Sequence, residues 1–269
     1  LIPPSFTPKK KFIFKNQVTK EFDVIISCGR KSVIPSIILK KNSSKKVVNI
    51  HIQNPKVSLD NFDIIVAPDH DSIEGSNVLI SKGAIHYLTS DEINKAKGYL
   101  EDKIEKQKEV ITLILGGPTK YYNYDNESMI QIFSKINKQI VEKNMQLIVI
   151  PSNRTPEKTI QFAKEYFNKN RLILDKVDKQ AYLSSLALAK YIIVTCDSSS
   201  MISEAALTGK PVYVAMIPAM RNDKRFQKFR NLLESMNIIR KLENNLETWS
   251  YEKLDETNRI AKQIKDKLL

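Results

Sequence analysis

Short apolar runs rich in Val and Ile alternate with amphipathic segments along almost the whole chain. In the first part of the chain we expect strands at residues 23–27, 46–52, 63–67 and 77–80, with helices at 32–40 and 90–106. Runs of this length are typical of strands that are buried on both faces of a parallel sheet. The alternation of strands with helices therefore predicts an α/β domain with crossover helices.

The second part of the chain repeats this pattern. We expect strands at 110–115, 147–150, 172–174, 191–195 and 212–215, and helices at 126–142, from Pro156 onward, and at 180–188, 223–235 and 254–268. In the helix at 126–142, apolar residues recur at the period of one buried face. We therefore predict two doubly wound domains, at residues 1–107 and 108–252, followed by a C-terminal helix within 253–269.

The segment from Val194 to Val214 is the most informative part of the pattern. It is typical of a strand, a turn rich in hydroxyl groups, a short helix that ends at Gly209, and another strand. A helix that begins at the carboxyl end of a parallel strand offers N–H groups and a partial positive charge to a phosphate or diphosphate. Glu204, about one turn into this helix, could accept hydrogen bonds from ribose hydroxyls. The alternative is an ordinary helix start that Asp197 or a serine caps and Glu204 supports.

Polar residues also follow the other strands of the second domain. In open α/β sheets, ligands bind at the carboxyl ends of the strands. Adjacent glycines allow the backbone to approach a phosphate, and Arg154 offers a planar pair of donors for phosphate oxygens. The candidate substrate-binding residues are Gly116, Gly117, Pro118, Thr119, Ser152, Arg154, Thr155, Asp197, Ser198, Ser200, Met201, Glu204 and Lys210.

In the first domain, His70 lies between two carboxylates, Asp69 and Asp71. A neighbouring carboxylate keeps an imidazole titrating near neutral pH, so His70 and Asp69 are candidates for acid–base catalysis. The alternative is that Asp69 caps a turn and His70 is a solvated loop residue. The sequence leaves both interpretations open and identifies no catalytic residue.

The chain of 269 residues carries a net charge of +13, which favours anionic partners. An overall Lys- and Asn-rich composition explains much of this excess. Lys9–Lys11 with Phe12 and Phe14, and Lys40–Lys46, are candidates for a patch that faces an anionic membrane. Nucleic acid is not an expected partner, because the charge is dispersed and no recognised binding module is present.

Cys28 and Cys196 are the two cysteines, and with three scattered histidines they form no metal-ligand pattern. We expect no metal and no cofactor, and reduced thiols in the cytoplasm. No apolar run approaches the roughly 20 residues of a membrane helix, and no signal peptide is visible. Any membrane contact is therefore expected to be peripheral, on the inner membrane.

Several motifs taken together indicate a family. In chain order they are CGRKS at Cys28, IQNPKV at Ile52, PDHD at Pro68, NVL at Asn77, GAIH at Gly83, LGGP at Leu115, PSNRTP at Pro151, DSSSMISEAALTGKPVYV at Asp197 and WSYEKLDET at Trp249. This set resembles the mitochondrial fission family named for elongated mitochondria (ELM-type), whose relatives are common in alphaproteobacteria. The resemblance implies a GT-B-like fold, with two Rossmann-like domains, a cleft between them and a last helix that crosses back to the first domain.

The second half is also similar to the nucleotide-sugar domain of the transferase that adds N-acetylglucosamine to a lipid-linked peptidoglycan precursor. That similarity implies that Gly116, Gly117 and Ser200 hold a diphosphate and that Glu204 holds the ribose. Family members usually begin with a further β-α unit that carries a Gly-His-x-x-Gln-type loop, and nothing precedes Leu1 here. We therefore expect a first domain without its initial β-α unit, and no general base can be transferred from the family.

Two hypotheses for function follow from these observations. The first is a metal-independent glycosyltransferase that binds a nucleotide-diphosphate sugar and acts on an envelope or lipid-linked acceptor. The second, implied by the plant relatives, is a non-catalytic adaptor on a membrane surface that recruits a dynamin-like partner.

Overall fold

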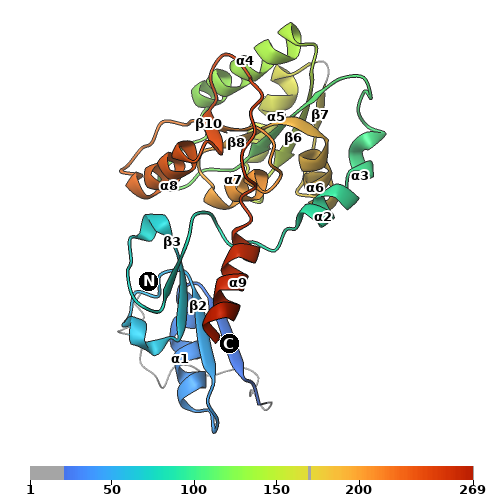
Figure 1. Ribbon diagram of the computed structural model, residues 1–269. Helices are drawn as coiled ribbons and strands as arrows, with labels where there is room; N and C mark the ends of the chain where they lie inside the picture. The colour runs from blue at the N-terminus through green and yellow to red at the C-terminus, as the bar shows by residue number, and fades with distance from the viewer. Residues whose placement is uncertain (1–20, 169–170, 269) are drawn as a thin grey trace. The chain divides into compact units, whose positions relative to one another are not determined.

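The computed structural model describes residues 21–168 and 171–268, which form two α/β units (Figure 1). The first unit comprises residues 21–82 together with the last helix, α9 (Glu256–Leu268). The second unit comprises Gly83–Asp255. Each unit contains one parallel sheet, which confirms the α/β fold class predicted from the alternating pattern.

The first unit has a four-stranded sheet whose strands lie in chain order. The strands are β1 (Val24–Cys28), β2 (Val48–Ile52), β3 (Ile64–Pro68) and β4 (Val78–Ser81). Helix α1 (Val33–Lys41) connects β1 to β2, and its Val33 packs with Ile65 and Ala67 on one face of the sheet. Helix α9 contacts β4, where the Arg259 guanidinium donates to the Ile80 carbonyl at 2.7 Å.

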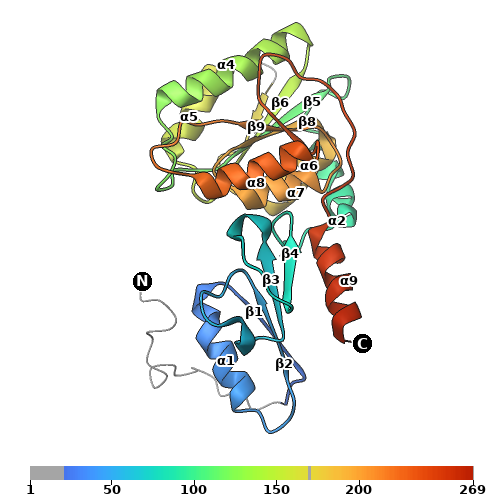
Figure 2. The same ribbon diagram turned by 60° about the vertical axis from the view of Figure 1, so that its left-hand side comes forward.

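The second unit has a six-stranded parallel sheet in the order β10-β9-β8-β5-β6-β7. Its strands are β5 (Val110–Leu115), β6 (Gln146–Pro151), β7 (Arg171–Ile173), β8 (Ala189–Thr195), β9 (Val212–Ala215) and β10 (Ile239–Lys241). Its longer helices are α4 (Asn126–Glu142), α5 (Glu157–Tyr166), α6 (Lys179–Leu188), α7 (Ser199–Ala206) and α8 (Lys224–Ser235). Figure 2 shows α4 and α5 on one side of this sheet and α6, α7 and α8 on the other.

The observed boundary between the units lies at residues 82/83 rather than at the predicted 107/108. The reason is that Leu88, Ile93 and Ala96 are buried in the core of the second unit. The single helix expected at 90–106 is two short helices, α2 (Ser90–Lys95) and α3 (Gly98–Glu101). The Leu100 N–H donates to Ser184 Oγ of α6 at 3.1 Å, which ties this segment to the second unit.

The predicted membrane-facing cluster at Lys9–Phe14 lies outside the described residues. Within 21–168 and 171–268, no helix has the length and apolar character needed to cross a bilayer.

Candidate functional site

The strand order of the second unit creates a topological switch point, where the chain leaves two neighbouring strands in opposite directions. Strands β5 and β8 are neighbours, but the chain leaves β5 toward β6 on one side and leaves β8 toward β9 on the other. The loops that follow the two strands therefore diverge, and this is the topological position at which open α/β sheets generally bind ligands. Gly116 and Gly117 follow β5, and Asp197 and Ser198 follow β8.

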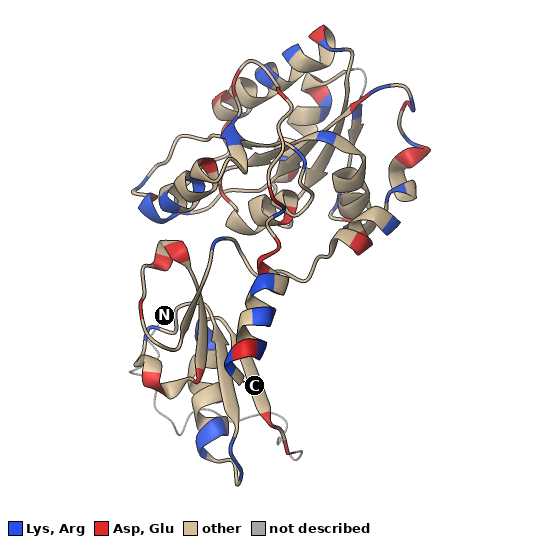
Figure 3. Cartoon of the chain, viewed as in Figure 1, with Lys and Arg blue, Asp and Glu red and all other residues tan. Residues whose placement is uncertain are grey.

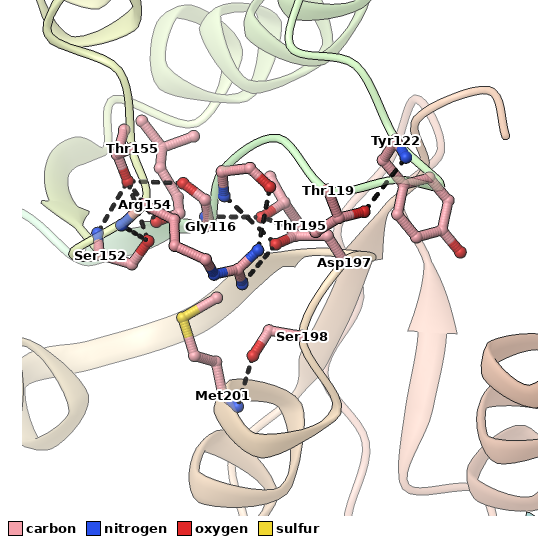
Figure 4. A network of polar contacts seen from close by, with 12 residues as sticks. Gly116, Thr119, Tyr122, Ser152, Arg154, Thr155, Thr195, Asp197, Ser198 and Met201 are labelled. Carbon is pink, nitrogen blue, oxygen red and sulfur yellow. Dashed lines mark hydrogen bonds and ion pairs between the residues drawn. The ribbon is translucent and has the colours of Figure 1, made fainter. Parts of the chain in front are cut away.

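Asp197 is the centre of a polar network at this switch point (Figure 4). Its side chain is fully buried. Its Oδ1 accepts hydrogen bonds from the Tyr124 hydroxyl at 2.5 Å and from Thr195 Oγ1 at 2.8 Å. Its Oδ2 accepts from the Gly117 N–H at 3.2 Å and from Arg154 Nη2 at 2.8 Å. Four donors thus compensate the buried negative charge, which is what a buried carboxylate requires.

The burial of Tyr124 raises the pKa of its phenol, and the adjacent Asp197 charge raises it further. The hydroxyl therefore remains a donor to Asp197 over the physiological pH range.

The two glycines are needed because protein groups approach them closely. A Cβ atom on Gly116 would lie 2.2 Å from Asp197 Oδ2, and one on Gly117 would lie 2.0 Å from the Arg154 carbonyl oxygen. The N–H of Gly116 donates to Thr195 Oγ1 at 2.8 Å, and that of Gly117 donates to Asp197. Both N–H groups thus already have acceptors inside the protein, which differs from the sequence-based expectation that this turn faces a phosphate.

The turn after β6 positions Arg154. Thr155 Oγ1 lies 2.5 Å from the Gly116 carbonyl and accepts from the Ser152 N–H at 2.8 Å, and Ser152 Oγ accepts from the Arg154 N–H at 3.3 Å. The guanidinium of Arg154 also donates to the Gly117 carbonyl at 3.1 Å. Its side chain is 43% exposed, so Arg154 remains partly accessible to a ligand.

The start of α7 lies beside this network. Ser198 is the N-cap residue, and its Oγ accepts from the Met201 N–H at 3.4 Å. The N–H groups of Ser199 and Ser200 have no partner within the helix, because the first N–H groups of any helix precede its first intrahelical bond. Ser200 is exposed. This helix start is the part of the predicted rim that can offer N–H donors and a partial positive charge to an anion.

Pro118 and Thr119 lie in the loop after β5. Thr119 Oγ1 accepts from the N–H groups of Tyr121 and Tyr122, at 3.1 and 3.2 Å, so it stabilises a turn, and Pro118 is exposed.

Glu204 contacts a neighbouring helix rather than the capped start of its own. The Tyr182 hydroxyl of α6 donates to Glu204 Oε2 at 2.6 Å. Burial raises the pKa of Glu204, whereas the Tyr182 hydrogen bond and the charge of His86 lower it. None of the described contacts of Glu204 caps the start of α7, which was the alternative role that the sequence left open.

Lys210 does not join the other predicted residues. It precedes β9 and so lies at the amino edge of the sheet, whereas the rim is at the carboxyl edge. Its Nζ donates to the carbonyls of Leu186 and Ala187, at 2.9 and 2.5 Å, and so caps the end of α6. Burial lowers the pKa of Lys210 to about 8. Its predicted role in phosphate binding is not supported. Lys210 comes before β9 and so lies at the amino end of that strand, whereas the prediction grouped it with residues that follow strands.

In the first unit, Asp69, His70 and Asp71 form one turn of 3-10 helix at the carboxyl end of β3. Asp69 is exposed and His70 is half-buried, and nothing in their described contacts assigns them to catalysis. Within residues 21–168 and 171–268 there is no group of three His, Cys, Asp or Glu side chains placed to hold a metal ion.

Sequence reasoning missed three residues of the site: Tyr124, Thr195 and Tyr182. Thr195 is the last residue of an apolar strand, where a hydroxyl next to Asp197 was an available signal. The two tyrosines had none, because their partners are 73 and 22 residues away in the sequence.

Comparisons with known proteins identify the family and the fold of the chain. The family model described as "Mitochondrial fission ELM1" matches residues 3–268. The chain is 25% identical over 274 residues to the mitochondrial fission protein ELM1 of Arabidopsis thaliana, a match that covers 91% of this chain and 64% of that protein. It is 27% identical over 282 residues to the uncharacterized protein RP120 of Rickettsia prowazekii, with coverages of 90% and 79%.

Among solved structures, the UDP-GlcNAc 2-epimerase of Methanocaldococcus jannaschii is similar, with a TM-score of 0.54 and 16% identity. The match covers 91% of this chain and 77% of that chain. At this identity the likeness shows the fold alone, which is GT-B-like with Rossmann-like domains.

Proposed function

This chain belongs to the mitochondrial fission ELM1 family, and we propose that it binds a nucleotide-diphosphate sugar at the carboxyl edge of the second sheet. We further propose that it transfers the sugar to an envelope or lipid-linked acceptor, working in the cytoplasm at the inner membrane. The observation that carries the proposal is the switch point between β5 and β8, with the start of α7 and the partly exposed side chain of Arg154 beside it.

The described contacts support a division of labour among the side chains. The Ser199 and Ser200 N–H groups and the positive end of α7 bind the diphosphate, and the partly exposed Arg154 donates to its oxygens. Glu204, held by Tyr182, accepts from the ribose hydroxyls. When the sugar leaves, negative charge develops on the diphosphate, and these donors stabilise it without reorganising. The glycine turn acts indirectly, because it allows Asp197 to hold Arg154 in place.

A thermal-shift screen with UDP-, GDP-, CMP- and dTDP-sugars tests the proposal. A ligand at 100 times its dissociation constant stabilises the folded protein by roughly 2.7 kcal/mol, so we expect at least one member to raise the melting temperature. If no member of the panel shifts the melting temperature, the proposal fails.

Ser200→Asp locates the binding site. A carboxylate in the first turn of α7 favours the helix but repels a diphosphate, so we expect an unchanged or higher melting temperature and a lost nucleotide shift. Ser134→Asp, at an exposed position within α4, is the matched control and retains the shift. Equal shifts in both variants would remove the α7 start from the site.

One observation favours a second candidate function, that of a non-catalytic adaptor. The N–H groups of the glycine turn and one edge of Arg154 are satisfied inside the protein, so the network needs no ligand to be stable. The 25% identical Arabidopsis relative is named a mitochondrial fission protein. An adaptor that recruits a dynamin-like partner would retain its function in the Ser200→Asp variant, whereas a transferase would lose it.

A further inference from the structure

Residues 83–88, which lead into α2, lie against α7 in the second unit. The Ala84 N–H donates to Ser203 Oγ at 2.9 Å, and Ser203 directly precedes Glu204. Burial raises the pKa of Glu204, whereas a hydrogen bond and the charge of His86 lower it. The segment therefore passes beside the carboxylate to which the proposed function assigns the ribose.

The next residue of this segment, Tyr87, presents an aromatic ring at the surface. Its side chain is 70% exposed. Lys179 Nζ lies over the ring, 4.8 Å from its centroid, and 3.8 Å from Glu92 Oε1. Lys179 is the first residue of α6, which follows β7, so the beginning of α6 lies at the carboxyl edge of the sheet, as the beginning of α7 does. The ring of Tyr87 is therefore at the edge where α/β sheets bind ligands.

Tyr182 connects Tyr87 with Glu204. The Tyr182 hydroxyl donates to Glu204 Oε2 at 2.6 Å. Burial raises the pKa of Tyr182 well above its ordinary value, the charge and hydrogen bond of Glu204 raise it further, and the nearby Tyr87 hydroxyl acts in the same direction. The two tyrosines and Glu204 thus form one cluster on α6, α7 and the segment before α2.

The backbone on both sides of Tyr87 is fixed. Before it, the Ala84 N–H is bonded to α7. After it, Leu88 is buried in the core, and Thr89 begins α2 with a capping box. In this box Thr89 Oγ1 accepts from the Glu92 N–H and Glu92 Oε2 accepts from the Thr89 N–H, both at 3.2 Å. A ring held in this way loses little conformational freedom when a ligand covers it.

The surface near Tyr87 does not carry charge of a single sign. The short helices α2 and α3, which follow the segment, carry both acidic and basic residues (Figure 3). A polyanion gains little from such a mixed surface. A flat ring system gains from an aromatic face, and every nucleobase has such a face.

We propose that Tyr87 is the stacking platform for the nucleobase of the bound nucleotide. The inference rests on the proposed function, which places the ribose at Glu204, because the base is bonded to that ribose and lies one sugar ring away. Lys179 lies over one face of the Tyr87 ring, so the base stacks on the opposite face. Tyr87 then selects a planar base, while the α7 start and Arg154 hold the diphosphate.

Calorimetric titration of the whole chain tests this role, with UDP, GDP, CDP and dTDP and with inorganic pyrophosphate as a ligand without a base. Tyr87→Ala should weaken the nucleoside diphosphate that binds the wild type most tightly by at least about fivefold, and should leave pyrophosphate binding unchanged. Tyr87→Phe keeps the ring and should bind like the wild type. Val141→Ala, which changes a 72% exposed apolar side chain on α4, is the control and should also bind like the wild type. Because Tyr87 is exposed, none of these changes should lower the melting temperature.

The stacking role is overturned if Tyr87→Ala binds the nucleoside diphosphate as tightly as the wild type does. It is also overturned if Tyr87→Ala weakens pyrophosphate equally, or if Tyr87→Phe loses as much affinity as Tyr87→Ala. In these three cases the wild type still binds a nucleotide, and the proposed function stands. A wild type that binds no nucleoside diphosphate overturns both.

Discussion

Asp197 connects the residues at the carboxyl edge of the second sheet into a single unit. It accepts hydrogen bonds from Tyr124, Thr195, Gly117 and Arg154, and its side chain has no exposed surface. Removing one partner from such a network leaves a buried polar group unsatisfied, which costs roughly 1–3 kcal/mol. The first effect that we expect of a substitution in this network is therefore a loss of folding stability, whatever its effect on binding.

Gly117→Ala tests the close approach of the backbone. The added Cβ would lie 2.0 Å from the Arg154 carbonyl oxygen, and because this neighbour is backbone it cannot rotate away. We expect a loss of about 1–3 kcal/mol in the free energy of unfolding, measured by denaturant titration. Gly98→Ala is the control, because nothing lies within 4 Å of its Cβ position. A Gly117→Ala protein as stable as the wild type would show that the turn is not packed as described.

The buried His51 leads us to expect that the stability of the first unit depends on pH. Its ring is completely buried against Phe62, and burial lowers its pKa to about 4. Since the unfolded chain binds a proton near pH 6.5 and the folded chain does not, stability is full above that pH and falls as the pH drops toward 4. We expect the free energy of unfolding to fall by about 2 kcal/mol between pH 7 and pH 5, as measured by thermal unfolding at each pH.

His51→Gln should flatten this pH dependence, and His70→Gln, which changes a half-buried histidine of the same unit, should retain it. If both variants keep the wild-type slope, His51 is not the titrating group.

At this scale the sequence predicted which residues end the strands but not what they contact. Ser152, Arg154, Thr155, Asp197 and Ser198 all lie at the carboxyl edge of the second sheet, because parallel strands bring their ends to one edge. The N–H groups of the two glycines donate to Thr195 and Asp197, which are 79 and 80 residues away in the sequence. No local sequence pattern encodes such a pairing.

Among the elements, α4 holds an extended segment by a repeating set of contacts. Lys135, Gln139 and Lys143 donate from one stripe of α4 to the carbonyls of Leu242, Asn244 and Leu246, respectively. Four residues of a helix advance about 6 Å, and two residues of an extended chain advance about 6.6 Å, so the two spacings match. Residues 242–246, which follow β10, are therefore fixed without a strand partner on that side.

Gln139→Leu tests this arrangement. The Gln139 side chain is fully buried, and it both donates to the Asn244 carbonyl and accepts from the Leu246 N–H at 3.2 Å. Leucine fills a similar volume but leaves both backbone groups without a partner, so we expect a loss of about 2 kcal/mol in a denaturant titration. Gln131→Leu, on the exposed side of α4, should change stability by less than about 0.5 kcal/mol. Equal stabilities would contradict the role of the stripe.

The long periodic helix of the second unit was predictable, whereas one of its three-residue strands was not. The helix expected at 126–142 is observed with those bounds, because its apolar period is regular and Asp125 caps its start. Strand β10 was missed, because Ile239-Arg240-Lys241 is too short to show an alternation. It forms because its register places Ile239 beside Val212 of β9, a tertiary pairing.

For the whole molecule, topology carries more of the functional argument than any motif does. The order β10-β9-β8-β5-β6-β7 makes the β5/β8 boundary a ligand site in principle, and no stretch of sequence encodes that order directly. The boundary at residue 82 was misplaced from sequence for the same reason, because the affiliation of residues 83–107 depends on the core they join.

Calorimetric titration with UDP, GDP, CDP and dTDP, on the wild type and on Glu204→Gln, tests the central claim most directly. Glutamine keeps an acceptor for Tyr182 but removes the charge offered to a ribose. We predict that at least one nucleoside diphosphate binds the wild type, and that Glu204→Gln binds it about tenfold or more weakly, with an unchanged fold. Glu157→Gln, at the exposed start of α5, should bind like the wild type. No binding by any nucleoside diphosphate would contradict a nucleotide site at the carboxyl edge of the second sheet, and equal affinities for wild type and Glu204→Gln would contradict the binding of the ribose by Glu204.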